Sequence, residues 1–191
     1  VRNGSEGFFL VWEDKVPGGR DRILLNHYDM RGVVARNANG VEIEGYFHSQ
    51  SIPKVSASVG AKISFAWIEE IEPGKKALFV QQANSRIALS WTDQPGGVVV
   101  TRPEGNITEY SVSLDGKSST NVGWIEKVDG SKHLVAVNRI DKRGTLDHKD
   151  PVIVEESNTQ KSNLHVLAAP DLGAAVIWVD IQGGRSLIKF A

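Results

Sequence analysis

Short apolar stretches that alternate with polar residues recur along the chain, and four of them end in a tryptophan. The tryptophans are Trp12, Trp67, Trp124 and Trp178, so the intervals between them are 55, 57 and 54 residues. Alternation with a period of two is typical of a half-buried β-strand, and no stretch sustains the period of 3.6 that predicts a helix. The pattern therefore predicts an all-β chain built from a repeat of about 55 residues.

A β-hairpin is predicted at each tryptophan. Two residues after each indole comes an acidic residue: Asp14, Glu69, Glu126 and Asp180. A glycine turn follows, and a basic residue stands seven or eight positions after the tryptophan, at Arg20, Lys75, Lys132 and Arg185. Glycine turns between alternating apolar segments are a hairpin signal. We expect acid and base to lie near each other across the hairpin mouth, and the indole to be buried between stacked sheets.

Two further strands are predicted in each full repeat, a valine-rich strand after the hairpin and another strand just before the next tryptophan strand. Four short antiparallel strands in each repeat suit one blade of a β-propeller. The repeats span approximately 1–48, 49–105, 106–159 and 160–191, which gives about three and a half blades in a single propeller segment. Propellers generally close with four to eight blades, so we expect the chain to be a fragment or part of a ring.

Three motifs carry a resemblance to a known family. They are Val11-Trp12-Glu13-Asp14, Gln50-Ser51-Ile52-Pro53 and Asp141-Lys142-Arg143-Gly144-Thr145-Leu146-Asp147. With them, nearly the whole chain resembles the blade repeats of large secreted bacterial β-propeller proteins. The resemblance implies a secreted or cell-surface bacterial scaffold and is not specific for any activity. Two departures matter: the second repeat adds Trp91, and the third has Gly123 where a bulky apolar residue is typical.

Composition narrows the classes of function. The 191 residues are 40% hydrophobic and 24% charged, which is normal for a globular domain. A net charge of −1 gives no global attraction to nucleic acid, and no apolar run is long enough to predict a membrane span. Cysteine is absent, which removes disulfides, thiolate chemistry and cysteine-based zinc sites from consideration.

Catalytic chemistry has no clear sequence signature. The histidines at positions 27, 48, 133, 148 and 165 are scattered over different repeat positions and lack the spacing of a zinc site. Among them, we consider a loop site for His148, in the segment 147–150. The recurring acids could bind a cation or act as a glycosidase carboxylate pair if they faced one funnel. A motif present in every repeat is more typical of a scaffold, so we assign no catalytic residue, no metal ligand and no cofactor.

Aromatic residues outside the repeat are the candidates for a binding surface. They are Trp91, Tyr46 with its neighbour His48, and Tyr110; for Trp91 we favour the alternative that it fills space beside its own blade. The sequence favours a non-catalytic scaffold that binds a protein or a carbohydrate through its loops. Two alternatives stay open: a segment of a propeller-type glycoside hydrolase, and an assembly subunit that pairs through open sheet edges with copies of itself or with the remaining blades.

Overall fold

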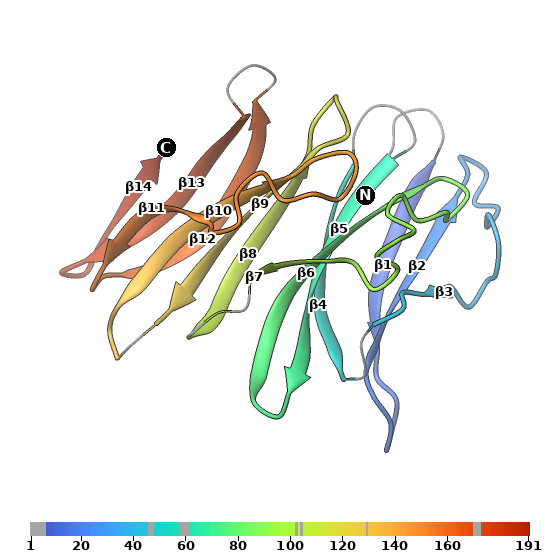
Figure 1. Cartoon of the computed structure of the whole chain (residues 1–191), viewed down its shortest axis with the longest axis horizontal. Coiled ribbons are helices and arrows are strands. Elements are labelled where there is room, and N and C mark those ends of the chain that lie inside the picture. Colours follow the sequence, from blue (N-terminus) through green and yellow to red (C-terminus); the bar gives the residue numbers. More distant parts are fainter. Residues whose placement is uncertain are drawn as a thin grey trace. The chain divides into compact units, whose positions relative to one another are not determined.

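The structure, a computed structural model, is built from β-strands throughout the part that it describes (Figure 1). The described residues are 7–45, 48–57, 62–101, 103, 105–128, 130–169 and 173–191. Within them the chain has fourteen strands and no helix, and the strands form four antiparallel sheets. The all-β architecture of repeated sheets that the sequence predicts is therefore confirmed.

The described residues contain no helix long and apolar enough to cross a bilayer.

The chain divides into two compact units. The first consists of Val1–Arg102 with the turn Arg143–Thr145, and the second consists of Pro103–Lys142 with Leu146–Ala191. Each unit holds two sheets, and each sheet takes its strands from one of the four sequence repeats. We describe the units separately.

In the first unit, a three-stranded sheet packs against a four-stranded one. The first sheet has the order β1-β2-β3, formed by β1 (Phe8–Asp14), β2 (Arg22–Tyr28) and β3 (Val41–Glu42). The second has the order β4-β5-β6-β7, formed by β4 (Gln50–Ala57), β5 (Lys62–Glu72), β6 (Lys75–Asn84) and β7 (Val98–Thr101). Their common core includes Phe9, Ile23 and Leu25 from the first sheet and Ile63, Phe65, Trp67 and Phe79 from the second.

In the second unit, the order of sheets is reversed, with the four-stranded sheet first in sequence. The third sheet has the order β11-β10-β9-β8, formed by β8 (Asn106–Leu114), β9 (Thr120–Lys127), β10 (His133–Ile140) and β11 (Val152–Ser157). The fourth has the order β12-β13-β14, formed by β12 (Gln160–Ala169), β13 (Gly173–Gln182) and β14 (Arg185–Phe190). Their common core includes Ile125 and Val135 from the third sheet and Leu164, Val166, Val176 and Trp178 from the fourth.

A ladder of side chain to backbone hydrogen bonds joins these last two sheets. The backbone amides of Leu164, Val166 and Ala168 on β12 donate to Glu109, Ser111 and Ser113 on β8, over 3.0, 3.1 and 2.9 Å. Gly123 on β9 permits the close approach, because a Cβ there would lie 2.7 Å from Cγ2 of Val166. Because β12 packs where a side chain at position 123 would lie, the third repeat has a glycine there.

The tryptophans are packing residues. The indole of Trp67 is fully buried and stacks with Phe65 and with Phe79, each with its ring centroid 5.7 Å away. Its edge lies against Gly97, where a Cβ would be 2.6 Å from Cη2 and where φ is +84°. Glycine is required on both counts, since other residues rarely adopt this conformation. A large aromatic surface removed from water in this way is a major contribution to the core.

A buried amide side chain that the sequence reading missed recurs 14 residues after three of the tryptophans. These residues are Asn26, Gln81 and Asn138. In each, the side-chain oxygen accepts the next residue's backbone N–H over 2.8–3.0 Å, and the side-chain nitrogen donates to a carbonyl in the loop that leads to the outer strand. The amide thus holds that loop against the hairpin, which satisfies backbone groups that no strand pairs.

The ion pairs at the first three hairpin mouths differ from the predicted ones. Asp14 pairs with Arg22 rather than Arg20, and Lys75 pairs with Glu72. Lys132 pairs with Glu156 from the neighbouring strand β11. The antiparallel register explains the first case, because it sets Asp14 directly opposite Arg22. The predicted bases lie at the turns, where side chains are exposed and an ion pair with any one partner contributes little free energy.

Candidate functional site

A hollow of about 300 Å³ opens in the second unit, where the loop between β10 and β11 lies beside strands β9 and β13. The residues that line it are Asn121, Val137, Asn138, Arg139, Asp147, His148, Val152, Gly173 and Ala174. All belong to the second unit. A concave surface with a few converging polar groups is the usual form of a small-ligand site.

The recurring amide positions the loop that forms one wall of the hollow. Asn138 Nδ2 donates to the carbonyl of His148 over 2.8 Å, and the backbone N–H of Arg139 donates to Asn138 Oδ1 over 2.8 Å. The backbone N–H of Asp147 donates to the carbonyl of Arg139, also over 2.8 Å. Backbone groups of Asp147 and His148 therefore hold this loop beside Arg139, and the carboxylate of Asp147 adds a side-chain contact.

The guanidinium of Arg139 is fixed by three oxygen atoms. Nη1 lies 3.0 Å from Asp147 Oδ2, while Nη2 lies 3.1 Å from Asp115 Oδ2 and 2.9 Å from Ser119 Oγ. Burial opposes the charged form of Asp115, but the backbone amides of Ser119 and Lys117 and the guanidinium outweigh it and lower the pKa of this carboxyl. The hydrogen bonds that Arg139 donates to Asp147 and Asp115 raise the pKa of Arg139. The site therefore keeps a cation between two carboxylates.

Two donors at the hollow lack a partner within the described residues. Asn121 is 2% exposed and its Nδ2 makes no hydrogen bond; the same holds for the buried Nε of Arg139. An unmatched buried donor costs about 1–3 kcal/mol, and native proteins contain few of them. Asp147 supplies acceptor oxygens at the same hollow, and His148 lines it as well. Hydroxyl groups, which donate and accept at once, match the partly exposed pair of Arg139 and Asp147.

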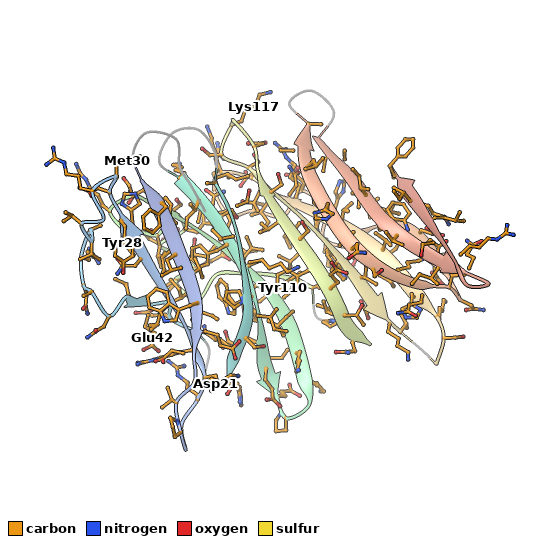
Figure 2. All side chains as sticks on the ribbon, turned by 180° about the vertical axis from the view of Figure 1, so that it is seen from behind. Asp21, Tyr28, Met30, Glu42, Tyr110 and Lys117 are labelled. Carbon is orange, nitrogen blue, oxygen red and sulfur yellow. The ribbon has the colours of Figure 1, made fainter. Side chains whose placement is uncertain are left out.

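The aromatic candidates from the sequence lie elsewhere. Trp91 is 3% exposed in the first unit, where Gly144 lies against its indole. Tyr110 lies on β8 (Figure 2). It is 2% exposed, and His48 is half-buried. Tyr46 lies outside the described residues. None of the three described residues lines the hollow, and the burial of Trp91 and Tyr110 leaves them almost no surface for a ligand.

The recurring acids are engaged by neighbouring groups of the fold. Glu69, fully buried, accepts the indole N–H of Trp67 over 3.1 Å and faces Gln50 Nε2 at 3.4 Å. Glu126 accepts the backbone N–H of Gly105 over 2.7 Å. These contacts favour the scaffold interpretation of the motif over the carboxylate-pair interpretation.

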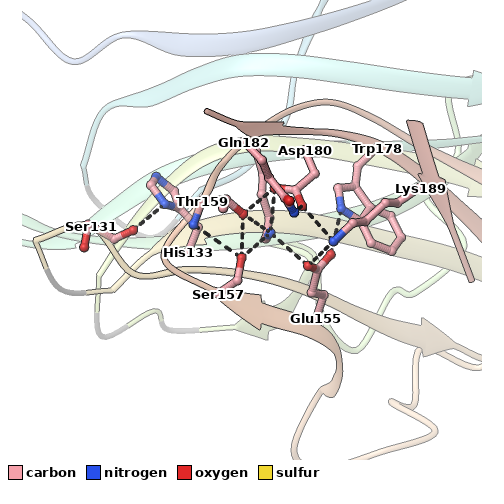
Figure 3. A network of polar contacts seen from close by, with 10 residues as sticks. Ser131, His133, Glu155, Ser157, Thr159, Trp178, Asp180, Gln182 and Lys189 are labelled. Carbon is pink, nitrogen blue, oxygen red and sulfur yellow. Dashed lines mark hydrogen bonds and ion pairs between the residues drawn. The ribbon is translucent and has the colours of Figure 1, made fainter. Parts of the chain in front are cut away.

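Asp180 belongs to a buried cluster of charges in the second unit (Figure 3). Its carboxylate lies 3.4 Å from Lys161 Nζ and 2.7 Å from Lys189 Nζ, and it accepts hydrogen bonds from Thr159 and Gln182. Burial disfavours the charged form, but the bonds from Lys189, Thr159 and Gln182 and the charge of Lys161 outweigh it and lower the pKa of Asp180.

Glu155 completes this cluster from the third sheet. It accepts the indole N–H of Trp178 over 3.0 Å and lies 2.6 Å from Lys189 and 3.4 Å from Lys161. Every charge in the cluster has an opposite partner, and the cluster joins two sheets, so its role is structural. Within the described residues no group of three or more histidine or acidic side chains is arranged to hold a metal ion.

No family model matches the chain, and a search of curated proteins gives no match.

Proposed function

We propose that the chain is a run of β-propeller blades that acts as a non-catalytic binding module of a secreted or cell-surface bacterial protein. Four antiparallel sheets that repeat in sequence order, each with a hairpin at its tryptophan, support the propeller assignment. The motif resemblance supports the location. The recurring acids are bonded within the fold, which argues against the glycoside hydrolase alternative.

The ligand that suits this module best is a carbohydrate, bound in the hollow of the second unit. The observation that carries this proposal is the ion pair of Arg139 and Asp147 at the hollow, whose side chains are 35% and 33% exposed and are held in place by the fold. A sugar hydroxyl can accept from a guanidinium and donate to a carboxylate, so neighbouring hydroxyls of one sugar ring would match this pair.

The test is a titration of the purified chain with a panel of monosaccharides and short glycans, followed by NMR of backbone amides. We expect shifts confined to residues around the hollow. Asp147→Asn keeps the shape of this side chain and removes its charge, so binding should be lost while the thermal midpoint changes little, because the ion pair with Arg139 is partly exposed. His133→Ala, at a histidine of the same unit outside the hollow, is the matched control and should bind normally.

Two results would refute this ligand assignment. One is that no sugar of the panel, even at a saturating concentration, shifts the amide signals of the residues around the hollow. The other is unchanged affinity in the Asp147→Asn variant, because the proposed ligand binds that carboxylate.

A further inference from the structure

The fourth sheet exposes apolar side chains at repeat positions that are buried in the other sheets. Ile188 and Phe190 on β14 are 78% and 83% exposed. They lie opposite the residues that directly follow and precede the tryptophan of the neighbouring strand. The equivalent positions are Ile23 and Leu25 on β2 and Val135 and Val137 on β10. Ile23, Leu25 and Val135 are all fully buried. Leu167 on β12, 52% exposed, shares the open face of the fourth sheet.

Both units show what covers this face when it is buried. In the first unit, Ile23 and Leu25 form a core with Phe65 and Trp67, which point from the tryptophan-bearing face of the next sheet in sequence. In the second unit, the third sheet's Val135 forms a core with Val176 and Trp178 of the fourth sheet in the same way. The rule within each unit is therefore that this face packs against the tryptophan face of a following sheet.

The first sheet has the complementary open face. Phe8, Leu10 and Trp12 alternate along β1 on the side opposite the first unit's core. Phe8 and Leu10 are 42% and 46% exposed, whereas the equivalent Ile63 and Phe65 on β5 are fully buried. Trp12 is partly exposed, whereas Trp67 is buried completely.

We propose that two copies of this chain associate head to tail, with the open face of the fourth sheet of one copy packed on the tryptophan face of the first sheet of another. Each face would then receive the kind of partner that its equivalents have inside the units. Burial of Leu10, Ile188 and Phe190 would remove exposed apolar surface that a monomer rarely keeps. The contact joins two different surfaces, so it can close into a ring or continue into an open chain. This inference does not depend on the carbohydrate proposal.

The test compares self-association of three variants by analytical ultracentrifugation over a wide range of concentrations. The wild-type chain should associate as concentration rises. Ile188→Lys and Leu10→Lys should each be monomeric, because each loses one of the two complementary faces. Met30→Lys, at an exposed residue of the turn after β2 (Figure 2) that is not among the residues of either face, is the control and should associate like the wild type. Circular dichroism and thermal unfolding verify that the variants fold.

An equimolar mixture of the two monomeric variants gives the decisive result. Each variant keeps the face that the other has lost, so the mixture should form a one-to-one heterodimer and nothing larger. The proposal is overturned if the wild type stays monomeric at every concentration, or if either variant still self-associates. It is equally overturned if the mixture remains monomeric while both variants are folded.

Discussion

The second and fourth sheets place an acid at the same repeat position and stabilise it in different ways. In the second sheet, the carboxylate of Glu69 lies within a mostly apolar core and is bonded to an indole and an amide. In the fourth sheet, Asp180 lies between two ammonium groups, one of which, Lys161, is completely buried. The repeat position therefore determines where the acid is buried, whereas residues of the neighbouring strands determine which groups it contacts. The difference can be measured, because the loss of a neutral partner and the loss of a charged partner change stability by different amounts.

The largest effect is expected from Asp180→Leu. The substitution leaves Lys161 buried with only Glu155, at 3.4 Å, as an opposite charge, so we expect the second unit to lose about 3–5 kcal/mol of stability. Hydrogen exchange of the β13 amides, compared with the wild type, measures the loss. Adding Lys161→Met should restore part of it. A loss below 1 kcal/mol, roughly the value of an exposed pair, would show that the cluster is not what holds this region.

A smaller effect is expected from Glu69→Leu in the first unit. The indole N–H of Trp67 would lose its acceptor while the ring stays packed, which should cost about 1–3 kcal/mol. The amides of β5 report the change by hydrogen exchange. Glu72→Leu alters an exposed acid of the same strand and serves as the control, for which a change within about 1 kcal/mol is expected. If the two variants lose equal stability, the bond to the indole contributes nothing.

The smallest effect, per unit of pH, is an acid sensitivity of the second unit that depends on Asp180. The folded-state pKa of Asp180 is lowered, so its contribution to stability is complete above the unfolded value near 3.9 and is lost as pH falls from there toward the folded pKa. One such group changes stability by at most about 1.4 kcal/mol per pH unit. Unfolding of wild type and Asp180→Asn between pH 5 and pH 2, followed at β13, should show a shallower slope for the variant. Parallel slopes would contradict the assignment.

Local patterns predicted the hairpins and the membership of each sheet, because alternation and turn glycines act within a few residues. The partners of the acids could not be read from them. Glu155 reaches Trp178 and Lys189 from another sheet, and nothing in the spacing of these residues indicates that contact. Trp91 was considered for a surface and is buried, because its position depends on a turn distant in sequence, at Gly144.

One residue that shapes the candidate site could have been predicted from the sequence, although the aromatic candidates lie elsewhere. The amide that occurs 14 residues after three tryptophans, Asn138 in the third repeat, holds the loop of His148. A search for repeated polar positions, in addition to repeated apolar ones, would have found it. The unmatched Nδ2 of Asn121 required coordinates, because only the positions of all nearby acceptors show that none is in reach among the described residues.

The ladder between β8 and β12 has a consequence for how neighbouring sheets are aligned. Apolar contacts between two faces are non-directional and would permit one sheet to slide along the other. The donors at Leu164, Val166 and Ala168 are spaced like their acceptors, so sliding by one step would leave a donor without its acceptor at one end of the row. Each pair is 55 residues apart in sequence. An insertion or deletion between them would thus shift the alignment unless a loop absorbed it, which gives a mechanical reason for the length of this repeat to be kept.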